Sequence, residues 1–154
     1  QFVLDSDSSG TVLFCCKNDG NFTFHVKRGD EAQKQIILRA DKVLVSFVVQ
    51  KHYGVESYVK NKNDIYDLLD KYGVALIVAE DLYLVVLPEF KLLLETLKRE
   101  KFEKLKEIDL VSNVPKYQGV RLGIYRYKER KKIEGGEIAL PMPHIGRELR
   151  LRVD

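Results

Sequence analysis

Apolar and polar residues alternate along this chain in short blocks that predict both strands and helices. Thr11–Cys16 (TVLFCC), Gln35–Leu38 (QIIL) and Val74–Ala79 (VALIVA) are almost wholly apolar. Such runs are typical of buried strands, and VALIVA, apolar on both alternating faces, fits a parallel sheet covered by helices. Val43–Gln50 is apolar and rich in β-branched residues, so a further strand is predicted there. NFTFHVKRGD (21–30) is ambiguous between helix and strand.

Two other blocks repeat their apolar residues with helical spacing. A helix is predicted over Asn63–Tyr72, with Asn63 as its N-cap, Asp64 in its first turn and Gly73 just past its end. A second helix is predicted to begin at Pro88, because proline suits the first helical position. The apolar positions are Ile65, Leu68, Leu69 and Tyr72 in the first helix, and Phe90, Leu93, Leu94 and Leu97 in the second.

The pattern changes after residue 101, where strands dominate. The predicted strands are Phe102–Val111, Gly119–Lys128, Glu137–Met142 and Glu148–Val153. This order of elements predicts an α/β fold, a small three-layer domain with a partly parallel sheet and a C-terminal antiparallel portion. We expect a single domain over residues 1–154, with an α/β core at 11–101 and a β-rich portion at 102–154.

Composition and charge fit an ordinary globular domain. Of the 154 residues, 45% are hydrophobic and 32% are charged, and a net charge of only +3 gives no reason to expect a nucleic-acid partner. The apolar runs are far shorter than a membrane span, and the opening QFVLDSDSSG lacks the regions of a signal peptide. A chain that opens on glutamine suggests a processed product or an excised domain.

The two cysteines, Cys15 and Cys16, are adjacent on a predicted strand. Neighbouring strand residues point to opposite faces, so a disulfide between them would be strained, and buried thiols are expected instead. The three histidines show no metal-ligand spacing, and the glycines form no phosphate-binding loop. We therefore predict no metal site and no cofactor.

Two polar clusters follow predicted strands and supply the candidate binding residues. Arg39, Asp41 and Lys42 end one strand, and Glu80 and Asp81 end another. If these strands are parallel neighbours, both clusters line a crevice outside the carboxyl ends of the strands, where open α/β sheets bind ligands. The alternative, which we favour, is a network of ion pairs that satisfies the strand ends.

The segment VAEDLYLVVLPEFK (78–91) raises a catalytic alternative. An acid followed by Glu-x-Lys is the pattern of metal-dependent nucleases, and Asp81, Glu89 and Lys91 would be its catalytic residues. That chemistry needs Glu89 and Lys91 on a strand, where residues two apart point the same way. On a helix that begins near Pro88 they would diverge by roughly 200°. We therefore predict no catalytic residue here, whereas a strand running through Lys91 would restore the nuclease hypothesis.

The basic run KERKK (128–132) offers a third possibility, a surface for nucleic acid or anionic lipid. We favour a solvated loop, because short charged runs usually occupy one.

Four stretches, in order along the chain, carry a resemblance to a known family. They are TVLFCCKNDGNFTFHVKRGD, IILRADKVL, NDIYDLLDKYGVALIVAED, and KFEKLKEIDL followed by VRLGIYRYK. Together they resemble the soluble extracytoplasmic domain that follows the membrane spans of some polytopic glycosyltransferases. Those enzymes transfer sugars from lipid-phosphate carriers and are similar to the dolichyl-phosphate-mannose protein mannosyltransferases. In that family the catalytic acid lies in a loop between membrane helices, and this sequence holds no such loop.

The resemblance implies a non-catalytic accessory or binding domain associated with a membrane glycosyltransferase. It would lie on the extracytoplasmic side of a membrane and bind glycan, an acceptor or a partner protein there. The alternatives are a metal-dependent nuclease and a nucleic-acid or other binding module, with a cytoplasmic location as the alternative to the extracytoplasmic one.

Overall fold

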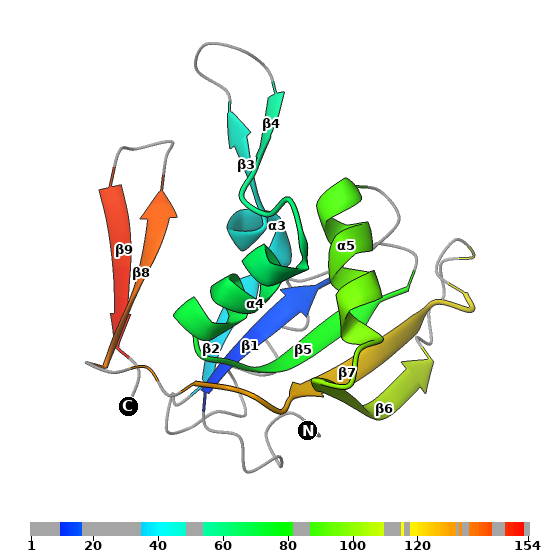
Figure 1. The fold of residues 1–154 in the computed structure, drawn as a ribbon. Coiled ribbons are helices and arrows are strands. Elements are labelled where there is room, and N and C mark those ends of the chain that lie inside the picture. The colour runs from blue at the N-terminus through cyan, green and yellow to red at the C-terminus, as the bar shows by residue number, and fades with distance from the viewer. Residues whose placement is uncertain are drawn as a thin grey trace.

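A five-stranded sheet forms the centre of the computed structural model (Figure 1), which describes residues 10–16, 35–48, 54–81, 87–109, 115, 118–131, 133, 136–142 and 147–152. The strands are ordered β2-β1-β5-β7-β6. They span Gly10–Cys15 (β1), Gln35–Arg39 (β2), Val74–Glu80 (β5), Phe102–Asp109 (β6) and Arg121–Tyr127 (β7). β1 pairs in parallel with β2 and β5, whereas β7 pairs antiparallel with β5 and β6. The predicted α/β domain with a partly parallel sheet and an antiparallel C-terminal portion is therefore confirmed.

β1 and β5 are neighbours inside this sheet and are buried along their whole length. Their alternating side chains supply two hydrophobic clusters. Leu13 and Ile77 belong to one cluster, and Val12 and Val78 belong to the other. Strands that are covered on both faces need apolar residues at every position, which is why TVLFCC and VALIVA show no polar alternation.

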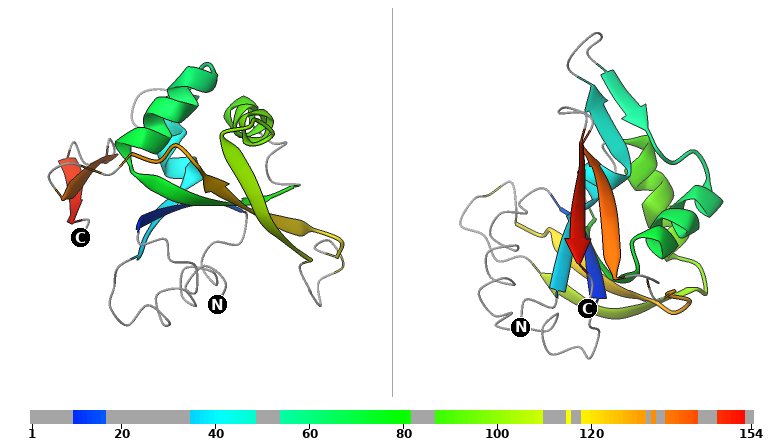
Figure 2. Two further views of the ribbon diagram at one scale, coloured as in Figure 1. Left: turned by 60° about the horizontal axis from the view of Figure 1, so that its bottom comes forward. Right: turned by 90° about the vertical axis from the view of Figure 1, so that its left-hand side faces the viewer.

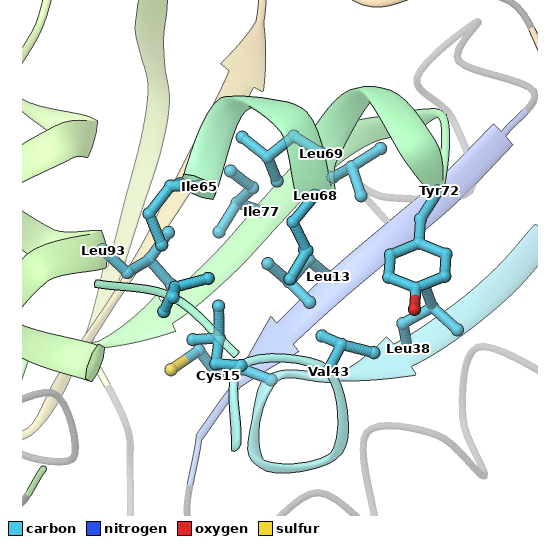
Figure 3. Packing of buried hydrophobic residues seen from close by; sticks show 14 of the residues in the cluster. Leu13, Cys15, Leu38, Val43, Ile65, Leu68, Leu69, Tyr72, Ile77 and Leu93 are labelled. Atoms are coloured by element: carbon cyan, nitrogen blue, oxygen red, sulfur yellow. The ribbon is translucent and has the colours of Figure 1, made fainter. Parts of the chain in front are cut away.

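Two helices, α4 (Lys62–Lys71) and α5 (Pro88–Leu97), lie on the same face of the sheet (Figure 2). The buried residues of α4 are those that the helical spacing predicted, with Tyr72 buried just past its end. In α5 the spacing correctly predicted Phe90, Leu93 and Leu97, whereas Leu94 is only partly buried and Thr96 is buried in addition. Side chains of both helices meet those of the sheet in one core (Figure 3), which includes Ile65, Leu68 and Leu69 of α4, Leu93 of α5, and Leu13 and Ile77 of the strands. This burial supplies most of the stability that short helices lack by themselves.

The ends of these helices confirm two predictions and correct a third. Gly73 follows the C-cap of α4 with a left-handed φ of 54°, and Pro88 occupies the first position of α5. The N-cap of α4, however, is Asn61 and not Asn63, so that prediction was wrong. The Asn61 side chain accepts hydrogen bonds from the backbone N–H groups of residues 63 and 64, and the Asp64 carboxylate accepts one from the Asn61 N–H. Only Asn61 stands three residues before an acid, which is the spacing that a capping box requires.

We expect Asn61→Ala to lower the free energy of unfolding by about 1 kcal/mol, because it removes the acceptor of two backbone N–H groups at the start of α4. The matched control is Asn63→Ala on the exposed second position of the helix, with an expected change within about 0.5 kcal/mol. Urea unfolding followed by circular dichroism measures both variants. A larger loss in the Asn63 variant would contradict the cap assignment.

The strand predicted over Val43–Gln50 is only partly correct. A short helix, α3 (Ala40–Val43), occupies its start, and strand β3 covers Val45–Val48. Val43 and Leu44 are buried in the core, and the Leu44 N–H donates to the Ala40 carbonyl. The apolar run thus contributes to two elements, a buried helical turn and a strand. Apolar residues repeat at different spacings in a helix and in a strand, so one spacing cannot describe the whole run.

β3 pairs antiparallel with β4 (Gly54–Ser57) in a hairpin that projects from the main sheet (Figure 1). A second hairpin joins β8 (Glu137–Met142) to β9 (Arg147–Arg152) and confirms the predicted final pair, with β9 beginning one residue earlier than expected. Ile138 is buried in the main core, so this hairpin is packed against the domain. The segment 21–30, which the sequence left open between helix and strand, lies outside the described residues, and so do residues 82–86 of the segment VAEDLYLVVLPEFK.

Candidate functional site

The two predicted polar clusters lie at the same edge of the sheet. β2, β1 and β5 are adjacent and parallel, so Arg39 at the end of β2 and Glu80 at the end of β5 flank the end of β1. Strands are about 4.8 Å apart, which places the two strand ends about 10 Å from each other. The two strands are parallel, as the predicted crevice required, but they are not neighbours, because β1 lies between them.

The first cluster is an ion-paired corner between β2 and α3. Arg39 donates from Nε and Nη2 to the two carboxylate oxygens of Asp41 at 2.9 and 2.8 Å, and Lys42 Nζ lies 3.5 Å from the same carboxylate. The Asp41 side chain is 13% exposed, so one carboxylate holds both cations against the domain. A bidentate Arg–Asp pair fixes orientation as well as charge, and it accounts for the LRADK pattern by structure alone.

The second cluster divides at the end of β5. Glu80 is buried, with 5% exposure. Asp81 turns towards β7, where its N–H donates to the Arg121 carbonyl and its carboxylate lies 3.8 Å from Arg121 Nε. Arg121 also donates to Glu107 of β6, so Asp81 belongs to the charged surface of β6 and β7. Because β7 and β2 lie on opposite sides of β5 in the sheet, Asp81 is directed away from Arg39 and Lys42.

Cys15 lies between the two clusters. Burial raises the pKa of its thiol, and the carboxylates of Asp41 and Glu80 raise it further, because both disfavour a nearby thiolate. Cys15 and Cys16 are unbridged and belong to opposite hydrophobic clusters, as expected for neighbours on a strand. A buried neutral thiol is a packing group and a poor nucleophile.

The three residues of the nuclease alternative do not assemble. Glu89 and Lys91 stand in the first turn of α5, and Asp81 is held by Arg121 on β7. The strand that would align Glu89 with Lys91 is replaced by a helix from Pro88 onwards. Glu89 and Lys91 nevertheless border one cavity, which the expected divergence on a helix did not predict.

This cavity, named here the α5 cavity, has a volume of about 500 Å³. It lies between the loop after β4 and the first two turns of α5. Its charged side chains are Lys60, Glu89, Lys91 and Glu95, and Ser57 with three apolar residues completes the lining. Glu89 Oε2 is buried and has no hydrogen-bond partner in the part of the chain that the structure describes. Lys60 and Glu95 escaped the sequence analysis, because only the folded chain brings the loop to the helix.

A second cavity of about 360 Å³ lies beside α4, α3 and β8. Two of its charged groups, Asp64 and Lys71, are engaged within the fold. The Asp64 carboxylate accepts the N–H groups of Lys60 and Asn61, and the first of these bonds is the main cause that lowers its pKa. Lys71 Nζ lies 5.2 Å from the centre of the Tyr72 ring. Burial raises the pKa of Tyr72, with a smaller contribution from Tyr58. This cavity therefore leaves less unused bonding capacity than the α5 cavity.

The basic run at 128–132 is tied to the domain. Glu129 accepts a bond of 2.6 Å from Lys101, and Lys131 Nζ lies 2.7 Å from the Asp70 carboxylate. The guanidinium of Arg130 lies against Gly10, where a side chain on the glycine would meet it. Lys132 lies outside the described residues. These contacts favour a structural loop over a free surface for phosphates.

Within the described ranges, no group of three or more His, Cys, Asp and Glu side chains is placed to hold a metal ion. No helix in that part of the chain is long and apolar enough to cross a membrane. Comparison of the chain with models of protein families, with curated proteins and with solved structures finds no match.

Proposed function

We propose that this chain is a non-catalytic binding domain that serves a membrane glycosyltransferase on the extracytoplasmic side of the membrane. One observation carries the proposal. The described parts of the four resembling stretches form adjacent parts of a single unit: β1, then β2 with α3, then α4 with β5, and finally β6 with β7. Together they account for every strand of the main sheet, so the resemblance extends over a whole domain and not over scattered motifs.

The motifs within these stretches also have structural explanations. L-R-x-D-K forms the ion-paired corner of Arg39 and Asp41, and Y-G-V ends α4 through the left-handed Gly73 before β5 begins. Residues of this kind specify a fold and perform no reaction, which supports an accessory role.

The test is surface labelling of intact cells of the source organism with a membrane-impermeant, amine-reactive biotin reagent. We expect the chain to be labelled before lysis, and cross-linking on the same cells to recover a polytopic glycosyltransferase with it. Labelling that occurs only after lysis, while an outer control protein is labelled in intact cells, would overturn the proposal.

A nuclease assay tests the catalytic alternative. The wild-type protein and Lys91→Ala are incubated with single- and double-stranded DNA and RNA in Mg²⁺ or Mn²⁺. Because Asp81 is paired with Arg121 and does not join Glu89 and Lys91, we expect no cleavage by either protein. Cleavage by the wild type that Lys91→Ala abolishes would refute the non-catalytic assignment.

A further inference from the structure

We infer that the α5 cavity binds a neutral polyhydroxylated ligand of the saccharide class. The inference rests on the proposed function, that of a non-catalytic binding domain, and adds the class of ligand that such a domain would bind. The grounds for the ligand class are the charges, the unused bonding capacity and the size of the cavity.

The charged side chains of the cavity balance one another without pairing. Lys60 and Lys91 contribute two positive charges, and Glu89 and Glu95 contribute two negative charges. None of the four forms an ion pair with any other described residue. Exposed ion pairs do occur elsewhere on the surface, as at Lys101–Glu129 and Arg126–Glu103. Opposite charges that border one space and remain apart leave their donors and acceptors available to a molecule between them.

Glu89 provides the clearest unused acceptor at the cavity. Its Oε2 atom is buried and has no hydrogen-bond partner among the described residues. A buried carboxylate oxygen without a donor costs free energy, because the hydrogen bonds it made with water are not replaced. A donor in the cavity would remove this cost once the Glu89 carboxylate turns Oε2 towards it, so Glu89 is the residue on which binding should depend most.

The mixture of groups selects the kind of ligand. Carboxylates only accept hydrogen bonds, and ammonium groups only donate them. A ligand that satisfies both must donate and accept, as a hydroxyl group does. An anion would be repelled by Glu89 and Glu95, and a cation would be repelled by Lys60 and Lys91. Since the four charges sum to zero, a neutral ligand with several hydroxyl groups fits the cavity best.

The remaining lining and the size agree with this class. Val59, Pro88 and Leu92 offer apolar surface to the C–H faces of a sugar ring. The volume of about 500 Å³ falls within the range of roughly 300–1,000 Å³ that is usual for small-molecule sites. There is room for a monosaccharide or a disaccharide.

The test is a titration of the ¹⁵N-labelled protein followed by amide NMR shifts. The probes are mannose, glucose, galactose, N-acetylglucosamine and their simple disaccharides, each up to roughly 50 mM, which detects dissociation constants in the millimolar range. We expect at least one sugar to cause saturable shifts confined to the amides of residues 57, 59, 60 and 89–95. Glu89→Gln should weaken that binding about tenfold or more, because a charge-assisted bond is lost. Glu103→Gln, the same change on the exposed surface of β6, should leave it unchanged.

Four outcomes would overturn the inference: no saturable shift with any sugar, shifts centred on the second cavity around Tyr58 and Tyr72, equal binding by Glu89→Gln, or saturable binding of inorganic phosphate or spermidine in place of sugar. The melting temperature of each variant shows that the protein tested is folded. Surface labelling reports separately on the proposed function. If sugars fail to bind but the chain is labelled on intact cells, only this inference falls. If sugars bind but labelling requires lysis, sugar binding by the α5 cavity is supported and the extracytoplasmic location is refuted.

Discussion

Replacing Phe90 with alanine should lower the free energy of unfolding by about 3–5 kcal/mol. Phe90 is 1% exposed and is the largest fully buried side chain described in the domain. It belongs to the core cluster that joins α5 to the sheet. Its removal costs both the transfer of a large apolar group from water and the cavity that the surrounding residues leave unfilled. The chain has no tryptophan, so urea unfolding is best followed by far-ultraviolet circular dichroism.

The matched control is Leu94→Ala on the same helix. Leu94 is only partly buried against the core, and we expect a loss of about 1 kcal/mol for it. The dependence of the unfolding free energy on urea concentration should be the same in all three proteins, because each of them exposes a similar additional area when it unfolds. Equal losses in the two variants would contradict the placement of α5, since they would mean that Phe90 and Leu94 are buried to the same extent.

Replacing Gly73 with valine should lower the free energy of unfolding by about 2–5 kcal/mol, the sum of a backbone and a packing cost. Gly73 has a φ of 54°, a left-handed conformation that disfavours side chains. A Cβ atom at this position would also lie 2.7 Å from Ile133 Cδ1 and 2.8 Å from Ile133 Cγ1. The backbone cost cannot be avoided, because Gly73 joins the end of α4 directly to the buried strand β5. The packing cost depends on how far the end of the Ile133 side chain can move.

Gly119→Val separates these two costs. Gly119 also has a left-handed φ, 78°, but a Cβ atom there would meet nothing within 4 Å. It should show the backbone cost alone, about 1–2 kcal/mol. The double variant Gly73→Val with Ile133→Ala should be less destabilised than the sum of the two single variants, because the contact is then absent. If Gly73→Val and Gly119→Val cost the same, the close approach of Ile133 to Gly73 has no energetic weight.

Local signals in the sequence were sufficient for most of the main sheet. Both faces of β1 and β5 are buried, so nearly all of their residues are apolar. These apolar runs are easily distinguished from the more polar sequence on either side. The apolar spacing of α4 and α5 is likewise a direct record of one buried face. The sequence raised the possibility that the carboxyl ends of β2 and β5 lie near each other only on the condition that the strands are parallel neighbours. They are parallel, with β1 between them.

The errors arose where one stretch of sequence serves two purposes. The run from Val43 onwards is apolar because it fills the core as α3 and then continues as β3, and its composition does not show where one ends. Both Asn61 and Asn63 are good caps by type, but only Asn61 stands three residues before an acid, and its bonds with Asp64 confirm it as the cap. The boundary between α3 and β3 has no such local signal, because it depends on hydrogen bonds that are made after the chain has turned.

The candidate site shows the same division between local and distant information. The sequence singled out Glu89 and Lys91 through a local motif, but it assigned them to a reaction that needs Asp81 nearby. The fold instead places Asp81 against Arg121 and brings Lys60 to the first turns of α5. Lys60 and Glu89 are far apart along the chain, and no short-range pattern links them.

By itself, the sequence determined which segments are buried, which of them are helices or strands, and which class of fold results. It could do so because the period of apolar residues directly records the number of faces that each segment buries. The tertiary structure alone decided which charged groups pair. Arg39 pairs with Asp41 and Asp81 pairs with Arg121, whereas the charged residues of the α5 cavity form no ion pair among the described residues. The physical reason is that pairing between charges depends on distances of a few ångströms between side chains, and those distances exist only once the strands and helices have packed.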